Sequence, residues 1–238
     1  MPSPRRDVEI LFEDDHLIAA VKPAGLPTAN APRGAESLFT LLQGRRPGGA
    51  FLGIVSRLDA PVSGVVVVAK TRAAAASLAE QFRERTVDKS YSAVVSGRFP
   101  APLGQWVDWH DSISREDGER RSELRADRDF DAGAAQPRPA HVRARVVRRA
   151  GEVSLVELEP STGRRHQLRL QLASRGCPIV GDRLYGSRLP CPAGGLALHA
   201  TRLAIDHPAS GQRMAFDAPC AGPWRRAFPS LFVGRSSG

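Results

Sequence analysis

The chain has 238 residues, of which 42% are hydrophobic, so it can form the core of one large domain or two small ones. Its formal net charge of +9 comes mainly from Arg, whose guanidinium binds phosphate and stacks on bases; a polyanionic partner is therefore our first expectation, although charge alone leaves open a basic but inert surface. The three cysteines lack metal-ligand spacing, so we expect reduced thiols, no metal site and a cytoplasmic location. No stretch of the sequence approaches the roughly 20 apolar residues of a membrane span, so we expect no membrane insertion.

The N-terminal segment predicts strands joined by short connections. Residues 8–21 alternate around a polar turn and predict a hairpin. A rigid Lys-Pro-x-Gly connection at 22–27 follows, which we interpret as scaffold, and a short helix is predicted over 37–43.

Two apolar, strand-like stretches then bracket a loop that holds one carboxylate, Asp59. On a strand, residues two apart share a face, so we expect Arg57 to point the same way as Asp59. Strands on both sides would hold the loop rigidly, which suits a catalytic acid, although an Asp in a loop is also a common cap of backbone amides. A helix is predicted over 72–85 with Thr71 as its N-cap. Its apolar stripe consists of Ala75, Leu78, Ala79 and Phe82.

The second half predicts more strands and one helix. A strand is expected over 89–97, a hairpin over 142–158 turning at Ala150-Gly151, a helix over 164–174 and a strand over 196–205. Residues 108–140 are charged and lack periodicity, which indicates a surface excursion. The frequent hairpins favour an α+β fold with a mostly antiparallel mixed sheet and flanking helices.

Three segments, taken together, resemble the RluA-type pseudouridine synthases. The first is Arg-Leu-Asp, three residues, Ser-Gly and a Val run at 57–70; the second is Lys-x-Tyr-x-Ala at 89–93. The third is Thr-Gly-Arg-Arg-His-Gln-Leu-Arg-Leu at 162–170, continuing to Gly-Asp-Arg-Leu-Tyr-Gly at 181–186. The resemblance extends from about residue 8 to residue 205 and is weakest over 108–140.

The resemblance implies an isomerase that converts a uridine in structured RNA to pseudouridine without a cofactor, on a fold with a central cleft. Asp59 would be the catalytic carboxylate, Arg169 its ion-pair partner, Tyr91 the ring that packs on the reacting base and Leu170 the wall of the uracil pocket. We expect substrate contacts from three further residues: Arg57, Arg165 and His166. From spacing alone, Arg165 and Arg169 would share a helix face, and without the resemblance we would interpret both as solvated or phosphate-facing arginines. Tyr91 taken alone would be a half-buried strand residue.

Three positions depart from the family pattern, which usually has His at 56, Thr at 62 and often His at 171, where this chain has Ser56, Val62 and Gln171. These departures support an alternative, a catalytically weak or inactive RNA-binding or RNA-folding protein on the same scaffold. A generic nucleic-acid-binding domain is a further alternative, but no helix-turn-helix or zinc-finger signature supports it.

We expect one catalytic domain over 1–238, without the N-terminal S4 module that many family members carry, and a monomer by default. The resemblance leaves open whether the substrate is ribosomal or transfer RNA, and whether Asp59 acts as nucleophile or as base.

Overall fold

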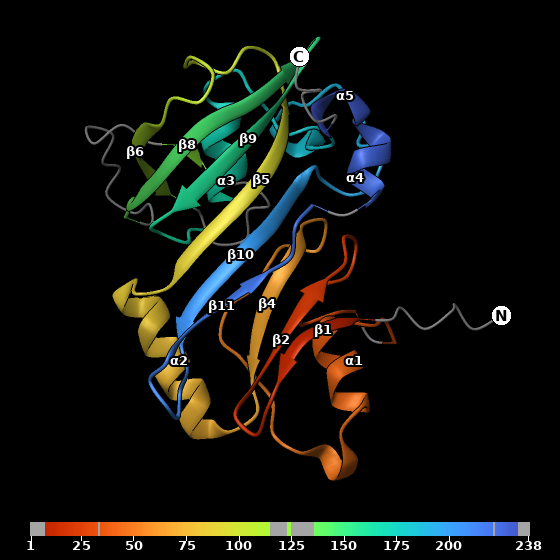
Figure 1. The fold of residues 1–238 in the computed structure, drawn as a ribbon, viewed down its shortest axis with the longest axis vertical. Coiled ribbons are helices and arrows are strands. Elements are labelled where there is room, and N and C mark those ends of the chain that lie inside the picture. Colours follow the sequence, from red (N-terminus) through yellow and green to blue (C-terminus); the bar gives the residue numbers. More distant parts are fainter. Residues whose placement is uncertain (1–7, 33, 115–122, 125–135, 221, 233–238) are drawn as a thin grey trace, which may run out of the picture. The chain divides into compact units, whose positions relative to one another are not determined.

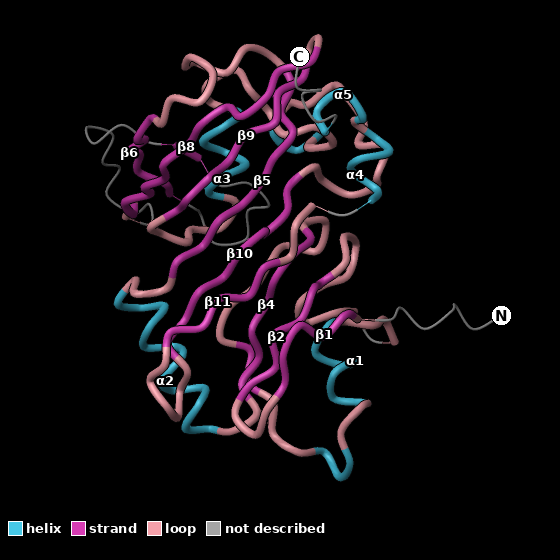
Figure 2. The backbone as a smooth tube through the Cα atoms, viewed as in Figure 1, coloured by secondary structure: helices cyan, strands magenta, loops and turns pink. Residues whose placement is uncertain are grey.

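The computed structural model describes residues 8–32, 34–114, 123–124, 136–220 and 222–232. The chain is organised as two compact units, each formed by discontinuous segments (Figure 1). Unit 1 comprises Met1–Asp88 and Ala200–Pro219, and unit 2 comprises Lys89–His199 and Cys220–Gly238. Strands and loops make up most of each unit, and helices are few (Figure 2).

In unit 1 the strand order is β1, β2, β4, β10, with β3 also paired to β4 and β11 paired to β10. The β1–β2, β2–β4, β3–β4 and β10–β11 pairs are antiparallel, whereas the arrows of β4 and β10 point the same way (Figure 1). The predicted hairpin at 8–21 is confirmed, since β1 and β2 pair antiparallel. Its strands are β1 (Glu9–Glu13), β2 (Leu17–Lys22), β3 (Gly53–Ile54), β4 (Ser63–Ala69), β10 (Leu198–Asp206) and β11 (Arg213–Asp217).

Both faces of the unit 1 sheet are covered, each by one helix (Figure 1). Alternate residues of β2 and β4 face α2 (Arg72–Glu84), and the residues between them face α1 (Leu38–Gly44). This is why β2 and β4 are apolar at almost every position rather than at every second one. Both helices have side-chain N-caps, Ser37 for α1 and Thr71 for α2, and the Thr71 cap is the predicted one.

In unit 2 the strands follow the order β5, β9, β8, β6, β7, and each neighbouring pair is antiparallel. Its strands are β5 (Asp88–Ser96), β6 (Val107–Ser114), β7 (Glu123–Leu124), β8 (Arg138–Ala150) and β9 (Val153–Pro160). Its helices are α3 (Gln167–Ala173), α4 (Gly222–Ala227) and α5 (Pro229–Phe232). Short 3₁₀ turns occur at Arg183–Tyr185 in unit 2 and at Pro47–Gly49 in unit 1.

The structure corrects two expectations. The predicted excursion over 108–140 is regular strand at both ends, because β6 covers 107–114 and β8 begins at 138; the strands β6 and β8 pair antiparallel. Most of the remaining excursion, 115–122 and 125–135, lies outside the described residues. In α2 the buried positions are Ala74 and Leu78, whereas Ala79 is exposed, so the apolar stripe is displaced from the predicted one.

Candidate active site

Asp59 lies in the loop of residues 55–62, which joins β3 to β4 in unit 1. The N–H of Val62 donates to the carbonyl oxygen of Asp59 at 3.0 Å, so residues 59–62 form a hydrogen-bonded turn with Asp59 at its first position. The Asp59 side chain is half-buried, while Val62 is buried. The turn bond uses only the backbone of Val62, and its apolar side chain suits the buried position, so the departure at this position is compatible with the turn.

The backbone before Asp59 is held by Thr28, a buried side chain from the connection after β2. Its Oγ1 donates to the carbonyl oxygen of Leu58 at 2.8 Å and accepts the Leu58 N–H at 3.1 Å. One hydroxyl therefore satisfies both backbone groups of the residue preceding Asp59, as a strand partner would.

The backbone after Asp59 is held by Lys22, the last residue of β2, whose side chain is 0% exposed. Its Nζ donates to the carbonyl oxygens of Leu26 at 2.7 Å, Pro23 at 3.0 Å and Ala60 at 3.2 Å. The N–H of Gly25 also donates to Ala60 O, at 2.7 Å. An ammonium group has three donors, so these acceptors match its capacity and tie the Asp59 loop to the Lys-Pro-x-Gly connection.

Arg57 lies on the same loop but not on a strand. β3 ends at Ile54, because its pairing with β4 is limited to Gly53 and Ile54. The expectation that Arg57 and Asp59 share a strand face is therefore wrong; Arg57 is an exposed loop residue.

Tyr91 lies on β5 in unit 2, directly opposite Leu158 of β9. Its side chain is half-buried, whereas Ala93, Val94 and Val95, further along the same strand, are completely buried. Tyr91 thus stands where β5 passes from its partly exposed beginning into the core, so its ring has both packing partners and access to solvent.

The helix predicted from residue 164 begins three residues later, at Gln167. The cause is His166, which adopts the left-handed conformation with φ 55° and ψ 17° and so interrupts any helix that includes it. Arg165 is exposed in the preceding turn. The prediction that Arg165 and Arg169 share a helix face is therefore wrong.

The side chain of Gln167 fixes this turn. Its Oε1 accepts hydrogen bonds from Thr162 Oγ1 at 2.8 Å and from the Arg164 N–H at 3.0 Å, and its Nε2 donates to the His141 carbonyl oxygen at 3.0 Å. The buried amide therefore links the turn before α3 to strand β8.

Arg169 points inward from α3 and is 6% exposed. Its Nε donates to Asp182 Oδ2 at 2.7 Å and its Nη2 donates to Asp182 Oδ1 at 2.8 Å, which is a bidentate, charge-assisted pair. Asp182 is 1% exposed, and its backbone carbonyl accepts from Tyr185 and Ser187. The loop after α3 therefore presents this carboxylate in a fixed position.

Two further side chains complete what we call the Arg169 network, formed by His166, Arg169, Asp182 and Tyr185. The Arg169 guanidinium lies over the Tyr185 ring, 5.1 Å from its centroid. The Tyr185 hydroxyl is 3.0 Å from His166 Nδ1. Arg169 is thus oriented by a carboxylate and by an aromatic ring, and its guanidinium has further donors besides the two that bind Asp182.

Leu170, the next residue of α3, belongs to a small apolar cluster with Ile113 of β6 and Ala140 of β8. Gln171 is completely buried, and its Nε2 donates to Asp111 Oδ2 at 2.7 Å and to the Ala140 carbonyl at 3.1 Å. The departure at this position therefore fills a structural role, since it ties α3 to the two neighbouring strands.

Unit 2 brings together Arg169, Leu170 and His166 on and just before α3, whereas Asp59 and Arg57 belong to unit 1. The pairing of Asp59 with Arg169 stays a prediction. Sequence reasoning did not assign roles to Asp182 and Tyr185, although both stand in the Gly-Asp-Arg-Leu-Tyr-Gly segment that carries part of the family resemblance. It also left the clamps of the Asp59 loop, Lys22 and Thr28, without specific partners.

Within the described residues, no group of three or more His, Cys, Asp and Glu side chains could hold a metal ion. None of the helices in that part of the chain combines the length and the apolar character needed to cross a membrane.

Comparison with known proteins identifies the class. A model of the RNA pseudouridylate synthase family matches residues 16–174. Ribosomal large subunit pseudouridine synthase C of Escherichia coli (strain K12) is 33% identical over 237 residues, covering 93% of this chain and 69% of that protein. Dual-specificity RNA pseudouridine synthase RluA of the same strain is 38% identical over 216 residues, covering 88% of this chain and 92% of that protein.

Among solved structures, human RNA pseudouridylate synthase domain containing 1 is similar with a TM-score of 0.75 and 28% identity, covering 97% of this chain and 89% of that one. The chain belongs to the RNA pseudouridylate synthase family. It is therefore an RNA-modifying isomerase, and the predicted α+β fold and reaction type are confirmed.

Proposed function

We propose that the chain isomerises a specific uridine in structured ribosomal or transfer RNA, with Asp59 as the catalytic carboxylate. The observation that carries this assignment is the mounting of Asp59 between two buried clamps. Thr28 fixes the residue before it and Lys22 fixes the residue after it. A half-buried carboxylate on a rigid loop loses little conformational freedom when it acts, which favours catalysis.

The reaction breaks the bond between the ribose carbon and the uracil nitrogen, turns the freed base and reattaches it through a ring carbon. The ring carbon loses a proton when it bonds to the ribose, and the freed nitrogen gains one, so the product is an isomer of the uridine and no co-substrate is consumed. The base must leave its stack to be reached, as in other enzymes that act on a nucleobase. Asp59 acts as an ionised group, either by attacking the nucleotide or by removing a proton.

Arg169 is the proposed cationic partner of Asp59. Its bidentate pair with Asp182 supports this role, because the guanidinium is buried and held in a defined orientation. Tyr91 is the proposed aromatic surface for the flipped uracil, and Leu170 is its apolar wall. The exposed Arg57 and Arg165, together with His166, are the proposed contacts to the RNA around that nucleotide.

Asp59→Asn tests the assignment, because it keeps the size and one oxygen of the side chain but removes its charge. We expect the variant to bind RNA like the wild type and to form no pseudouridine. The measurement is carbodiimide-dependent primer extension across ribosomal and transfer RNA from cells that lack the gene, complemented with either form. A stop that returns only with the wild type identifies both the reaction and the uridine; a stop restored equally by Asp59→Asn would refute the role of Asp59.

The same experiment tests the alternative of an inactive RNA-binding scaffold, which the departures at Ser56 and Val62 favour. That alternative predicts no change in any primer-extension stop with either form of the protein.

We further propose that the enzyme acts as a cytoplasmic monomer. All three cysteines are free thiols, which supports the cytoplasmic location.

A further inference from the structure

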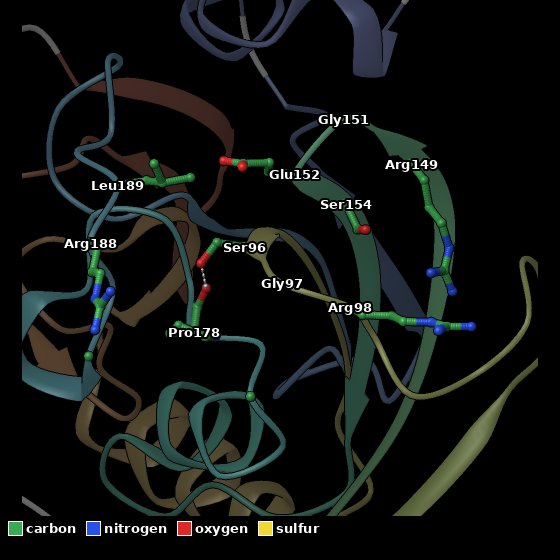
Figure 3. A pocket seen from close by; sticks show the side chains of 12 residues that line it. Ser96, Gly97, Arg98, Arg149, Gly151, Glu152, Ser154, Pro178, Arg188 and Leu189 are labelled. Atoms are coloured by element: carbon green, nitrogen blue, oxygen red, sulfur yellow. Dashed lines mark hydrogen bonds between the residues drawn. The ribbon is translucent and has the colours of Figure 1, made fainter.

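A pocket of about 670 Å³ opens in unit 2, at the end of β5 and beside the turn that joins β8 to β9 (Figure 3). Its size exceeds that of a single phosphate group and suits a stretch of nucleic-acid backbone. It is lined by Ser96, Gly97, Arg98, Arg149, Gly151, Glu152, Ser154, Gly176, Pro178, Gly186, Arg188 and Leu189.

Three arginines and one carboxylate give this pocket its charge. In Figure 3, Arg98 and Arg149 stand on one side and Arg188 on the other, with Glu152 at the rim. Within the described chain, neither Arg98 nor Arg188 forms an ion pair, and both are exposed. Two guanidinium groups that line one pocket without ion-pair partners among the described residues create a positive potential that favours an anion.

The third arginine is anchored. Arg149 Nη2 donates to the carbonyl oxygens of Phe99, at 3.4 Å, and Ala101, at 2.5 Å. A guanidinium has five N–H donors, so these bonds restrict its orientation and leave donors for a ligand. An arginine held this way loses less side-chain entropy on binding than a freely moving one.

Much of the wall between these arginines is backbone. Gly97, Gly151, Gly176 and Gly186 line the pocket, and each has a positive φ. Without side chains they let a ligand approach the main chain closely. The wall is also rigid, since the Gly97 N–H donates to the Glu152 carbonyl oxygen at 3.2 Å, and an added Cβ at Gly97 would lie 2.4 Å from the Gly176 oxygen.

The pocket lies far along β5 from the proposed base-stacking residue. Tyr91 and Ser96 are five residues apart on one strand, which corresponds to about 17 Å. A single nucleotide stacked on Tyr91 is too short to reach the pocket, whereas an RNA chain that continues from that nucleotide is long enough. The pocket is therefore distinct from the position proposed for the reacting uracil.

We propose that the pocket formed around Arg98, Arg149 and Arg188 binds the phosphate backbone of the substrate RNA at a distance from the modified uridine. This inference rests on the proposed function, because it assumes an RNA substrate that extends beyond the reacting nucleotide. Arg98 and Arg188 supply the free positive charges, Arg149 supplies an oriented donor set, and Glu152 opposes them. The pocket contributes affinity and register without reading bases.

The test is RNA binding by the full chain, measured by filter binding at several salt concentrations. The probes are an in vitro transcribed tRNA and an oligouridylate of about 20 nucleotides, long enough to track a basic groove. We expect the double variant Arg98→Ala/Arg188→Ala to bind at least about tenfold more weakly near 0.15 M salt. A plot of the logarithm of the association constant against the logarithm of the salt concentration has a negative slope. For the single-stranded probe, this slope should become less steep by about 1.4, because two phosphate contacts are lost.

The matched control is Arg83→Ala/Arg202→Ala. It removes the same net charge from exposed arginines of unit 1, which pair with Glu80 and Asp217. We expect this control to keep the wild-type affinity and salt slope nearly unchanged. Equal losses in the two double variants would overturn the inference, since total charge rather than the pocket would then explain binding.

Glu152→Gln should change the RNA affinity in the opposite direction to the arginine variants. Removing the carboxylate from the pocket should strengthen RNA binding, by a few-fold at low salt; unchanged or weaker binding would contradict the inference. None of these measurements requires turnover, so they also distinguish the pocket from the assignment of Asp59. If Asp59→Asn proves active while the pocket variants behave as expected, the catalytic proposal fails and the pocket stands.

Discussion

Replacing Asp182 by Asn tests the structural centre of the Arg169 network. Asp182 is 1% exposed and holds Arg169 through two hydrogen bonds of 2.7 and 2.8 Å. Asn keeps the shape of the side chain and one acceptor oxygen, but it replaces the other oxygen with an N–H₂ group that faces a donor of the guanidinium. The substitution therefore removes the negative charge and sets two donors against each other without opening a cavity.

The expected cost follows from the burial of the pair. Removing one partner of a buried ion pair destabilises a protein by about 3–5 kcal/mol, because the remaining charge has lost its compensation. The retained acceptor places Asp182→Asn near the lower end, at about 3 kcal/mol. With a urea dependence of about 3 kcal/mol per molar, the unfolding midpoint should fall by about 1 M.

The assay is urea unfolding followed by circular dichroism, with Arg169→Met and the double variant Arg169→Met/Asp182→Asn beside it. Each single substitution leaves a buried charge, whereas the double variant removes both charges. We therefore expect the double variant to be more stable than the sum of the two single losses allows. A loss below about 1 kcal/mol for Asp182→Asn would refute the reasoning, because that is the range of an exposed ion pair.

Two further predictions concern unit 1. Lys22→Met keeps the side-chain length but removes the donor to the carbonyl oxygens of Pro23 and Leu26 and leaves Ala60 O with only the Gly25 N–H. It should therefore lower the unfolding free energy by about 2–4 kcal/mol and reduce pseudouridine formation; an unchanged urea midpoint would contradict the clamp. The second concerns Asp14. Burial raises the pKa of its carboxyl group, but the hydrogen bonds from Leu17, His16 and His207 together lower it by more, so the pKa lies below its ordinary value. Its contribution to stability is therefore present above about pH 5 and is lost as the pH falls below about 4; Asp14→Asn should be less stable than the wild type at pH 7 and approach it at pH 3 in thermal unfolding.

The local elements followed from the sequence because their determinants are local. Strands β2 and β4 are apolar at nearly every position, and α2 has an N-cap and a helical spacing of apolar residues. These patterns depend on backbone geometry within a few residues, so they predict a strand or a helix before any partner is known. Elements that form only through contacts between residues far apart in the sequence were predicted less accurately. The strand β6 is one of them, because its pairing partner, β8, lies about 30 residues away in the sequence.

By itself, the sequence determined the hairpins, the capped helices, the loop position of Asp59 and, through three ordered motifs, the family. Tertiary structure decided which side chains meet. Arg169 finds Asp182 across 13 positions, and His166 takes a left-handed conformation beside a turn that Gln167 ties to β8. The three arginines that line the pocket come from three separate segments. These contacts depend on how the strands pair and where the loops end. They therefore cannot be predicted from the spacing of residues within one segment.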